Sequence, residues 1–336
     1  MIPADPIKQS RSPHPPDAAP RRADPPANAI APHPSGHFVH RAGAPILPHR
    51  LRAFAQFDLS GESHDAMHVL TAEGRSLQVL VPARWITLWM PLSGTLDMTV
   101  PDCRWRVPSG AALAWRERAL RVDAHRPAWW IAVCGSPQAW APYLRPHGDD
   151  CEAAPFPHQD ACSHTLRRLA VRTARMARRA DAGALAESTL AALGEELLDW
   201  QHTLHDLLPR CSGRTLYRRR QTLMRLLWVR HLIEHHEEAR LDLTTLAASA
   251  SYSACHLIRS YRDVFGETPS EHVTRLRSER ALKLVLETSM PVCEITEALG
   301  FESQSAFCRA FKNLYGMTTS QARHRLNDDL GASQAA

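Results

Sequence analysis

One stretch of the chain occurs twice: residues 246–271 recur in the same order at residues 295–321. Each copy runs from an apolar segment through a short turn into the pattern [LF]-x-R-x-[YF]-[RK]-x-x-[FY]-G-x-T-x-S. The copies are offset by 49 residues before the turn and by 50 after it, so the second turn is one residue longer. Helical periodicity on both sides of each turn predicts two helix-turn-helix units in one chain.

Local signals give the bounds of the predicted helices. A helix over 224–238 precedes the first unit, and support helices are expected at 244–250 and 291–299. Ser253 and Ser303 are N-cap residues for the second helix of each unit, which ends near Gly266 or Tyr315. Capping boxes begin at Thr268 and Thr318, and the first opens a connecting helix that reaches Thr288.

The second helix of such a unit commonly enters the major groove of DNA. Two units on one connecting helix can occupy successive grooves if these helices lie about 34 Å apart. Arg binds guanine, Gln binds adenine, and Ile or Cys packs on a thymine methyl. The predicted DNA-contacting residues are Ser253, Cys255, Ile258, Arg259 and Arg262 in the first unit, and Ser303, Gln304, Ser305, Cys308, Arg309 and Lys312 in the second. The alternative for Arg259 and Arg309 is a surface salt bridge.

Charge supports a nucleic-acid partner. The whole chain has a net charge of +5, and residues 214–325 alone hold 17 Lys and Arg against 12 Asp and Glu. The positive excess therefore lies on the repeated region, where DNA phosphates would need it. A solvated surface is the alternative interpretation of that excess.

The rest of the chain has a different composition. Residues 1–48 are rich in Pro and Ala and predict a disordered tail, and residues 326–336 predict a flexible one. Alternation of period two over 49–150 predicts an α+β chain whose N-terminal domain is a small antiparallel β-barrel or sandwich. Its expected strands are 77–81, 85–90, 95–100, 103–107, 111–115 and 129–134. The chain has no apolar run of about 18 residues and no signal-peptide core, so we expect a cytoplasmic protein without membrane contact.

Two helical stretches lie between 151 and 213. Leucines in the second recur at heptad-like spacing, which requires a partner helix. That partner is either in the same chain or in a second copy, as a homodimer; the residues are Leu190, Leu193, Leu197, Trp200, Leu204 and Leu207. Eight scattered cysteines without a C-x-x-C pair are most consistent with reduced thiols.

Glu294–Gly316 reads E-x-x-x-x-L-G-F-x-S-Q-S-x-F-x-R-x-F-K-x-x-x-G. Through this pattern residues 214–325 resemble the DNA-binding domain of the AraC/XylS family of bacterial transcription regulators. The first unit departs from the family at Ser251, where a turn glycine is common, and at Ala254, where Pro is frequent. The resemblance implies double-stranded DNA and RNA polymerase as partners, and an N-terminal cupin-like domain that binds a small effector or mediates dimerisation.

Catalysis is not expected. A cupin-type metalloenzyme would need closely spaced histidines with a Glu, whereas His64, His68 and His125 lack that spacing. A DNA alkyl-repair protein would need a Pro-Cys-His motif, which Cys211 does not provide. We expect neither a metal nor another cofactor, and place His231, His235 and His236 on a solvated helix face. Trp85, Trp89 and Trp105 are candidate effector-pocket residues, with core packing as the alternative.

Overall fold

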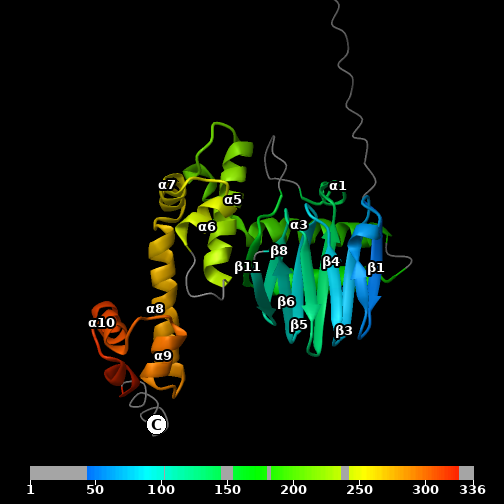
Figure 1. Ribbon diagram of the computed structural model, residues 1–336. Helices are drawn as coiled ribbons and strands as arrows, with labels where there is room; N and C mark the ends of the chain where they lie inside the picture. The colour runs from blue at the N-terminus through cyan, green and yellow to red at the C-terminus, as the bar shows by residue number, and fades with distance from the viewer. Residues whose placement is uncertain (1–43, 102, 145–153, 180–182, 236–241, 325–336) are drawn as a thin grey trace, which may run out of the picture. The chain divides into compact units, whose positions relative to one another are not determined.

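The computed structural model describes residues 44–101, 103–144, 154–179, 183–235 and 242–324. Both predicted tails lie outside these ranges, except for residues 44–48, the last three of which belong to the first strand. Strands and helices are labelled in Figure 1. The strands are β1 (Ile46–Leu51), β2 (Gln56–Asp58), β3 (Met67–Gly74), β4 (Leu77–Val81), β5 (Ile86–Ser93), β6 (Thr95–Val100), β7 (Cys103–Pro108), β8 (Ala111–Trp115), β9 (Leu120–Ala124), β10 (Ala128–Gly135) and β11 (His158–Ala161).

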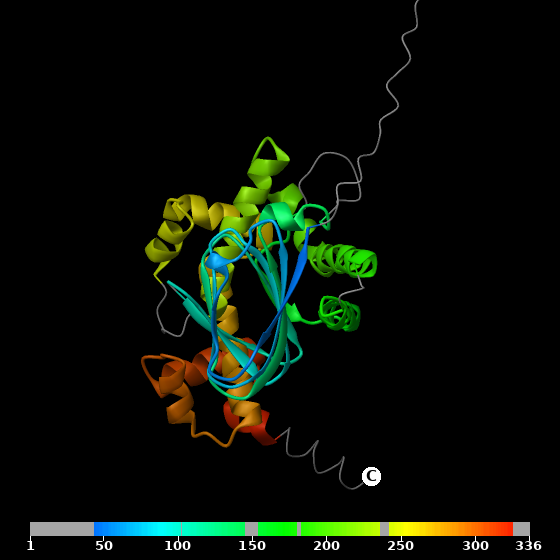
Figure 2. The same ribbon diagram turned by 90° about the vertical axis from the view of Figure 1, so that its right-hand side faces the viewer.

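These strands form two separate sheets. One has six strands in the order β1-β3-β10-β5-β8-β11, and the other has five in the order β2-β4-β9-β6-β7. The predicted hairpin β6–β7 is confirmed, with Met98 opposite Trp105, and its alternating apolar residues are buried between the sheets. Figure 2 shows the sheets face to face. The expected sandwich is therefore present, whereas a single closed barrel is not formed by the described strands.

The sequence did not predict five of the strands. β1, β2, β3, β9 and β11 are short or carry polar residues such as His49, His68 and Asp123, which interrupt the apolar alternation. β1 pairs with β3 and β2 pairs with β4 in parallel, not in the expected antiparallel sense. Two parallel neighbouring strands are not joined by a hairpin turn, so no local sequence pattern predicts that they pair.

Helices α2 (His164–Met176) and α3 (Gly183–Trp200) cover the outer face of the six-stranded sheet (Figure 2). Leu190, Leu193 and Leu197 of α3 are fully buried there against β-strand residues and α2. The chain then continues through α4 (His202–His205) and the 3-10 turn η2 (Leu208–Arg210), and Leu204 packs in a second cluster. The leucine stripe therefore finds its partner within the chain. The alternative of a homodimer interface along this stripe is wrong, because its central leucines are buried within the chain and are not accessible to a second copy.

Two leucines of α3 test this packing. Leu197→Ala should lower the free energy of unfolding by about 2–5 kcal/mol, because it leaves a cavity in a closed core. Leu185→Ala is the matched control: Leu185 is 46% exposed on the same helix, and its truncation should change stability by less than about 0.5 kcal/mol. Thermal unfolding followed by circular dichroism measures both. Equal effects, or a change in molecular mass on light scattering for a folded Leu197→Ala protein, would contradict the assignment.

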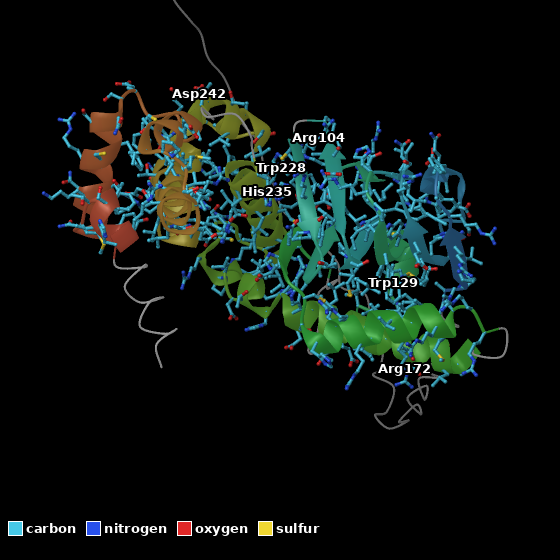
Figure 3. All side chains as sticks on the ribbon, turned by 90° about the horizontal axis from the view of Figure 1, so that it is seen from below. Arg104, Trp129, Arg172, Trp228, His235 and Asp242 are labelled. Carbon is cyan, nitrogen blue, oxygen red and sulfur yellow. The ribbon has the colours of Figure 1, made fainter. Side chains whose placement is uncertain are left out.

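Helix α5 (Leu216–His235) has buried residues on several of its faces between Thr222 and Ile233. Trp228 and His231 contact the five- and six-stranded sheets through Trp105 and Trp115, with ring centroids 4.3–5.9 Å apart. Trp228 and His235 are marked in Figure 3. The expected solvated histidine face is wrong for His231 and His235, which stack on each other at 4.3 Å; His236 lies outside the described residues. None of the described helices is long and apolar enough to span a bilayer.

Burial holds the pKa of His231 well below its usual 6.5, and the neighbouring His235 lowers it further. The folded chain therefore prefers neutral His231, so this stabilising contribution is complete above pH 6.5 and is lost as the pH falls below that value. The unfolding temperature should decrease between pH 7.5 and pH 5. In His231→Phe, which keeps a ring against Trp105 but cannot titrate, the decrease should be smaller. An unchanged pH dependence in this variant would contradict the assignment.

Candidate DNA-binding surface

The first helix-turn-helix unit consists of α6 (Leu243–Ser249) and α7 (Ala254–Phe265). The N–H of Tyr252 donates to the Ala247 carbonyl, and the N–H of Ser251 donates to that of Ala248, each at 2.9 Å. This Schellman motif requires a residue in the left-handed backbone conformation just after the helix. Ser251 has that conformation, with φ of 56°. Ser253 then caps α7 by accepting the His256 N–H, as predicted.

The second unit, α9 (Val292–Ala298) and α10 (Gln304–Tyr315), repeats this geometry. Here Gly300 is the left-handed residue with φ of 66°, and the same two backbone bonds close the turn. One extra residue, Glu302, precedes the N-cap Ser303, which explains the change of offset from 49 to 50. Phe307 and Phe311 bury one face of α10 in the core of this unit.

Helix α8 (Pro269–Glu287) connects the two units and is bonded to both. In the first unit the Tyr261 hydroxyl lies 2.6 Å from Nδ1 of the buried His272 on α8. In the second, the Tyr315 hydroxyl donates to the Ser278 carbonyl at 2.8 Å. Tyr261 corresponds to Phe311, and Tyr315 corresponds to Phe265, so the anchoring hydroxyl has changed position between the copies. The second helix of each unit is thus fastened to the connecting helix.

Both predicted capping boxes are formed. Thr268 accepts the Glu271 N–H and Thr318 accepts that of Gln321, each at 3.2 Å. Glu271 also accepts a hydrogen bond from Arg262 at 2.9 Å, and its pKa is lowered by the Thr268 N–H and hydroxyl and by Arg262. The second copy has neutral Gln321 at this position. Arg262 is therefore engaged by a carboxylate, whereas the box of the second unit offers no carboxylate to its counterpart Lys312.

The polar side chains predicted to contact DNA lie on the outer faces of α7 and α10. Ile258 and Cys308 are half-buried, and Cys308 packs against the core of the second unit. The others are exposed: Ser253, Cys255, Arg259, Arg262, Ser303, Gln304, Ser305, Arg309 and Lys312. Among the described residues, no carboxylate lies within ion-pair distance of Arg259 or Arg309. The salt-bridge alternative fails for these two arginines, although it holds for Arg262.

A reciprocal exchange tests the left-handed turn positions. Ser251→Gly should stabilise the chain by roughly 0.5–1 kcal/mol, because it removes left-handed strain of about 1–2 kcal/mol at the entropic cost of a glycine. Gly300→Ser should destabilise it by a similar amount. Differential scanning calorimetry of the two single variants measures both effects. Shifts of the same sign would contradict the proposed equivalence of the two turns.

The three tryptophans named as effector-pocket candidates pack against different neighbours. Trp89 is fully buried, donates to Thr87 at 2.9 Å and packs on Trp130. Trp105 packs against α5, and Trp85 lies beside His64 and His68. A cavity of about 160 Å³ between the β8–β9 loop and α5 is lined by Trp115 and Trp228 instead. The core-packing alternative therefore describes Trp89 and Trp105.

One further cluster escaped sequence analysis. His49, Glu62 and His68 place their ligand-type atoms within 4.8 Å of one another. Burial and the neighbouring His68 lower the pKa of His49. The metal-site argument from the sequence considered His64, His68 and His125, and it omitted His49 because the strand that carries it was not recognised. His49 and His68 come together through the parallel pairing of β1 with β3, for which the sequence carries no local signal.

Comparisons with known proteins agree with this geometry. Residues 246–325 match the family model described as "Helix-turn-helix domain". The chain is 32% identical over 94 residues to the regulatory protein SoxS of Salmonella typhimurium, which covers 28% of this chain and 88% of that protein. It is 30% identical over 101 residues to the MmsAB operon regulatory protein of Pseudomonas aeruginosa, which covers 30% of this chain.

The match spans only 33% of the length of the MmsAB operon regulatory protein. Among solved structures, the C-terminal domain of AraT, a response regulator from Geobacillus stearothermophilus, is 29% identical. That comparison covers 30% of this chain and 84% of the other, with a TM-score of 0.28. Each of these three matches covers 28–30% of this chain.

Proposed function

Because this chain belongs to the AraC/XylS family of transcriptional regulators, we propose that it regulates transcription by reading a specific DNA site with both of its helix-turn-helix units. Helices α7 and α10 enter successive major grooves, and α8 sets their separation. One observation gives the strongest support for this proposal. Arg259 and Arg309 occupy matched positions in the two copies, and both are exposed without a carboxylate partner in the described chain.

Individual contacts follow from the side chains. Arg259 and Arg309 bind guanine, Gln304 binds adenine, and Ile258, Cys255 and Cys308 pack on thymine methyl groups. Ser253 and Ser303, at the helix N-termini, contact phosphate, and Ser305 contacts a base edge. Lys312 adds a phosphate contact, and Arg262 adds a weaker one because Glu271 competes for it.

The N-terminal two-sheet domain is proposed to act as the regulatory part, either by binding a small effector or by pairing two chains. Its contact with α5 supports this proposal, since α5 also packs against the first helix-turn-helix unit. A ligand that changes this contact changes DNA affinity, and DNA changes ligand affinity by the same factor. RNA polymerase is the proposed further partner. The relatives matched are transcription regulators, and we propose no catalytic role.

Substitutions in α10 test the base-reading role. With a preferred site selected from random duplexes, Arg309→Ala should weaken binding by about 1–3 kcal/mol and relax the preference at one base pair. Lys312→Ala should weaken all duplexes alike and reduce the salt dependence. Arg172→Gln, which removes an exposed charge from α2 in the N-terminal half, is the charge-matched control and should bind as wild type (Figure 3).

Gel-shift titrations at fixed salt, over duplexes that each carry one base change, measure these effects. Unchanged selectivity at every position in Arg309→Ala would overturn the assigned base contact. Equal losses in Arg172→Gln and Lys312→Ala would show that net charge alone is being measured.

A further inference from the structure

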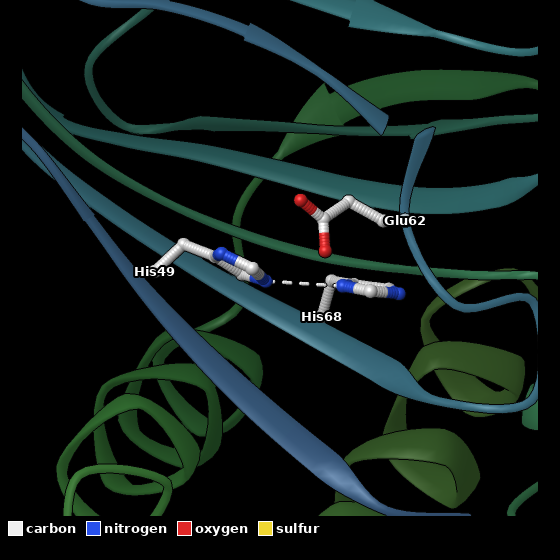
Figure 4. Close-up of side chains that lie close together, drawn as sticks. All are labelled: His49, Glu62 and His68. Atoms are coloured by element: carbon white, nitrogen blue, oxygen red, sulfur yellow. Dashed lines mark hydrogen bonds between the residues drawn. The ribbon is translucent and has the colours of Figure 1, made fainter. Parts of the chain in front are cut away.

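Three side chains from separate segments converge inside the N-terminal domain (Figure 4). His49 belongs to β1, His68 belongs to β3, and Glu62 follows the short 3-10 turn η1 (Leu59–Gly61). In the parallel β1–β3 register Leu47 is opposite His68 and His49 is opposite Leu70, so the two histidines are diagonal neighbours on one face. In Figure 4 the Glu62 carboxylate points toward the two imidazole rings.

The hydrogen bonds determine which nitrogen of His68 is protonated. Its Nε2 lies 2.8 Å from the Ser63 carbonyl oxygen, which can only accept, so Nε2 carries the proton. Nδ1 then has a lone pair directed at His49 Nε2, 3.0 Å away. In metal-ligating histidines, one ring N–H commonly donates to a backbone carbonyl, and the other nitrogen binds the ion through its lone pair. His68 has this arrangement of its two nitrogens.

The spacing of the two nitrogens fits a shared ion. Two ligands at about 2.1 Å from a metal lie about 3.0 Å apart at right angles and about 3.4 Å apart at the tetrahedral angle. The observed separation is 3.0 Å, at the short end of this range. The half-buried Glu62 has its carboxylate within 4.8 Å of both nitrogens, and a movement of roughly 1–2 Å would bring an oxygen to bonding distance of a shared ion.

The surroundings hold these groups in place. His68 is fully buried and stacks against Trp85 with ring centroids 5.4 Å apart. The loop that supplies Glu62 and the Ser63 carbonyl is fastened where Ser136 donates to the His64 carbonyl at 2.6 Å. A site with a locked tautomer and a packed ring needs little rearrangement to bind an ion.

We propose that His49, Glu62 and His68 bind one divalent first-row transition-metal ion. Two imidazoles and one carboxylate suit Zn²⁺, Fe²⁺ or Co²⁺ and disfavour Mg²⁺ and Ca²⁺, which prefer oxygen ligands alone. On binding, the proton of His49 Nε2 is transferred through solvent to Nδ1, and the His49–His68 hydrogen bond is replaced by two metal–nitrogen bonds. Three protein ligands leave at least one coordination position for water or a small anionic ligand.

The experiment uses the full chain after chelator treatment and dialysis. Titration with Co²⁺ should give visible d–d absorption that saturates at one ion per chain, and Zn²⁺ should displace it. Zn²⁺ should also raise the unfolding temperature, because it binds the folded state. Mg²⁺ should do neither.

Variants identify the ligands. His49→Gln and Glu62→Gln should each weaken Co²⁺ binding by about 100-fold or more, since even loss of an outer partner costs 10–100-fold. His64→Gln is the matched control: this exposed histidine lies in the same loop and also touches Trp85, but its ring is outside the cluster. It should bind Co²⁺ as wild type does. Far-UV circular dichroism establishes that each variant is folded.

Absence of Co²⁺ and Zn²⁺ binding at micromolar concentrations in wild type would overturn the proposal, as would wild-type affinity in both His49→Gln and Glu62→Gln. Loss of binding in His64→Gln to the same extent would overturn the assigned ligand set. Gel-shift assays on the same samples report DNA binding separately. The metal site and the proposed regulatory function can therefore fail independently.

Discussion

The burial of α5 on several faces at once is the constraint that joins the two-sheet domain to the first helix-turn-helix unit. An amphipathic surface helix needs one apolar stripe, but α5 is apolar around much of its circumference and must be enclosed. Trp228 and His231 are covered by Trp105 and Trp115, while Leu226 and Leu232 belong to the same cluster as Leu257 and Tyr261 of the first helix-turn-helix unit. One helix thereby contributes to the cores of two functional parts.

The two helix-turn-helix units depend on α5 to different degrees. The first shares the α5 cluster, whereas the second has its own core around Ile295, Phe307 and Phe311 on the C-terminal half of α8. The first also contains a buried polar pair, Tyr261 and His272, where the second has Phe311 and Ala322. Burial lowers the pKa of His272, so its neutral form is the one that pairs with Tyr261. A duplicated sequence has therefore acquired two distinct interiors.

What the sequence predicted well was local. N-caps at Ser253 and Ser303, the capping boxes and the left-handed helix ends at Gly266 and Gly316 involve residues only a few positions apart, and all are present. What it missed was long-range. The leucine spacing of α3 indicated that the helix packs against another element but did not identify that element. The leucines pack against both the six-stranded sheet and α2. His49 and His68 meet through a parallel pairing that leaves no periodic mark.

The charge difference between the two capping boxes has a consequence for symmetry. Glu271 neutralises Arg262 in the first unit, while Gln321 leaves the charge of Lys312 in place. A chain that lays both units along one duplex then has unlike ends, unlike a two-fold dimer that reads a palindrome. Under the proposed function, the binding site is then a directional sequence, not a palindrome. The orientation of such a site relative to a gene would become a variable that the protein can distinguish.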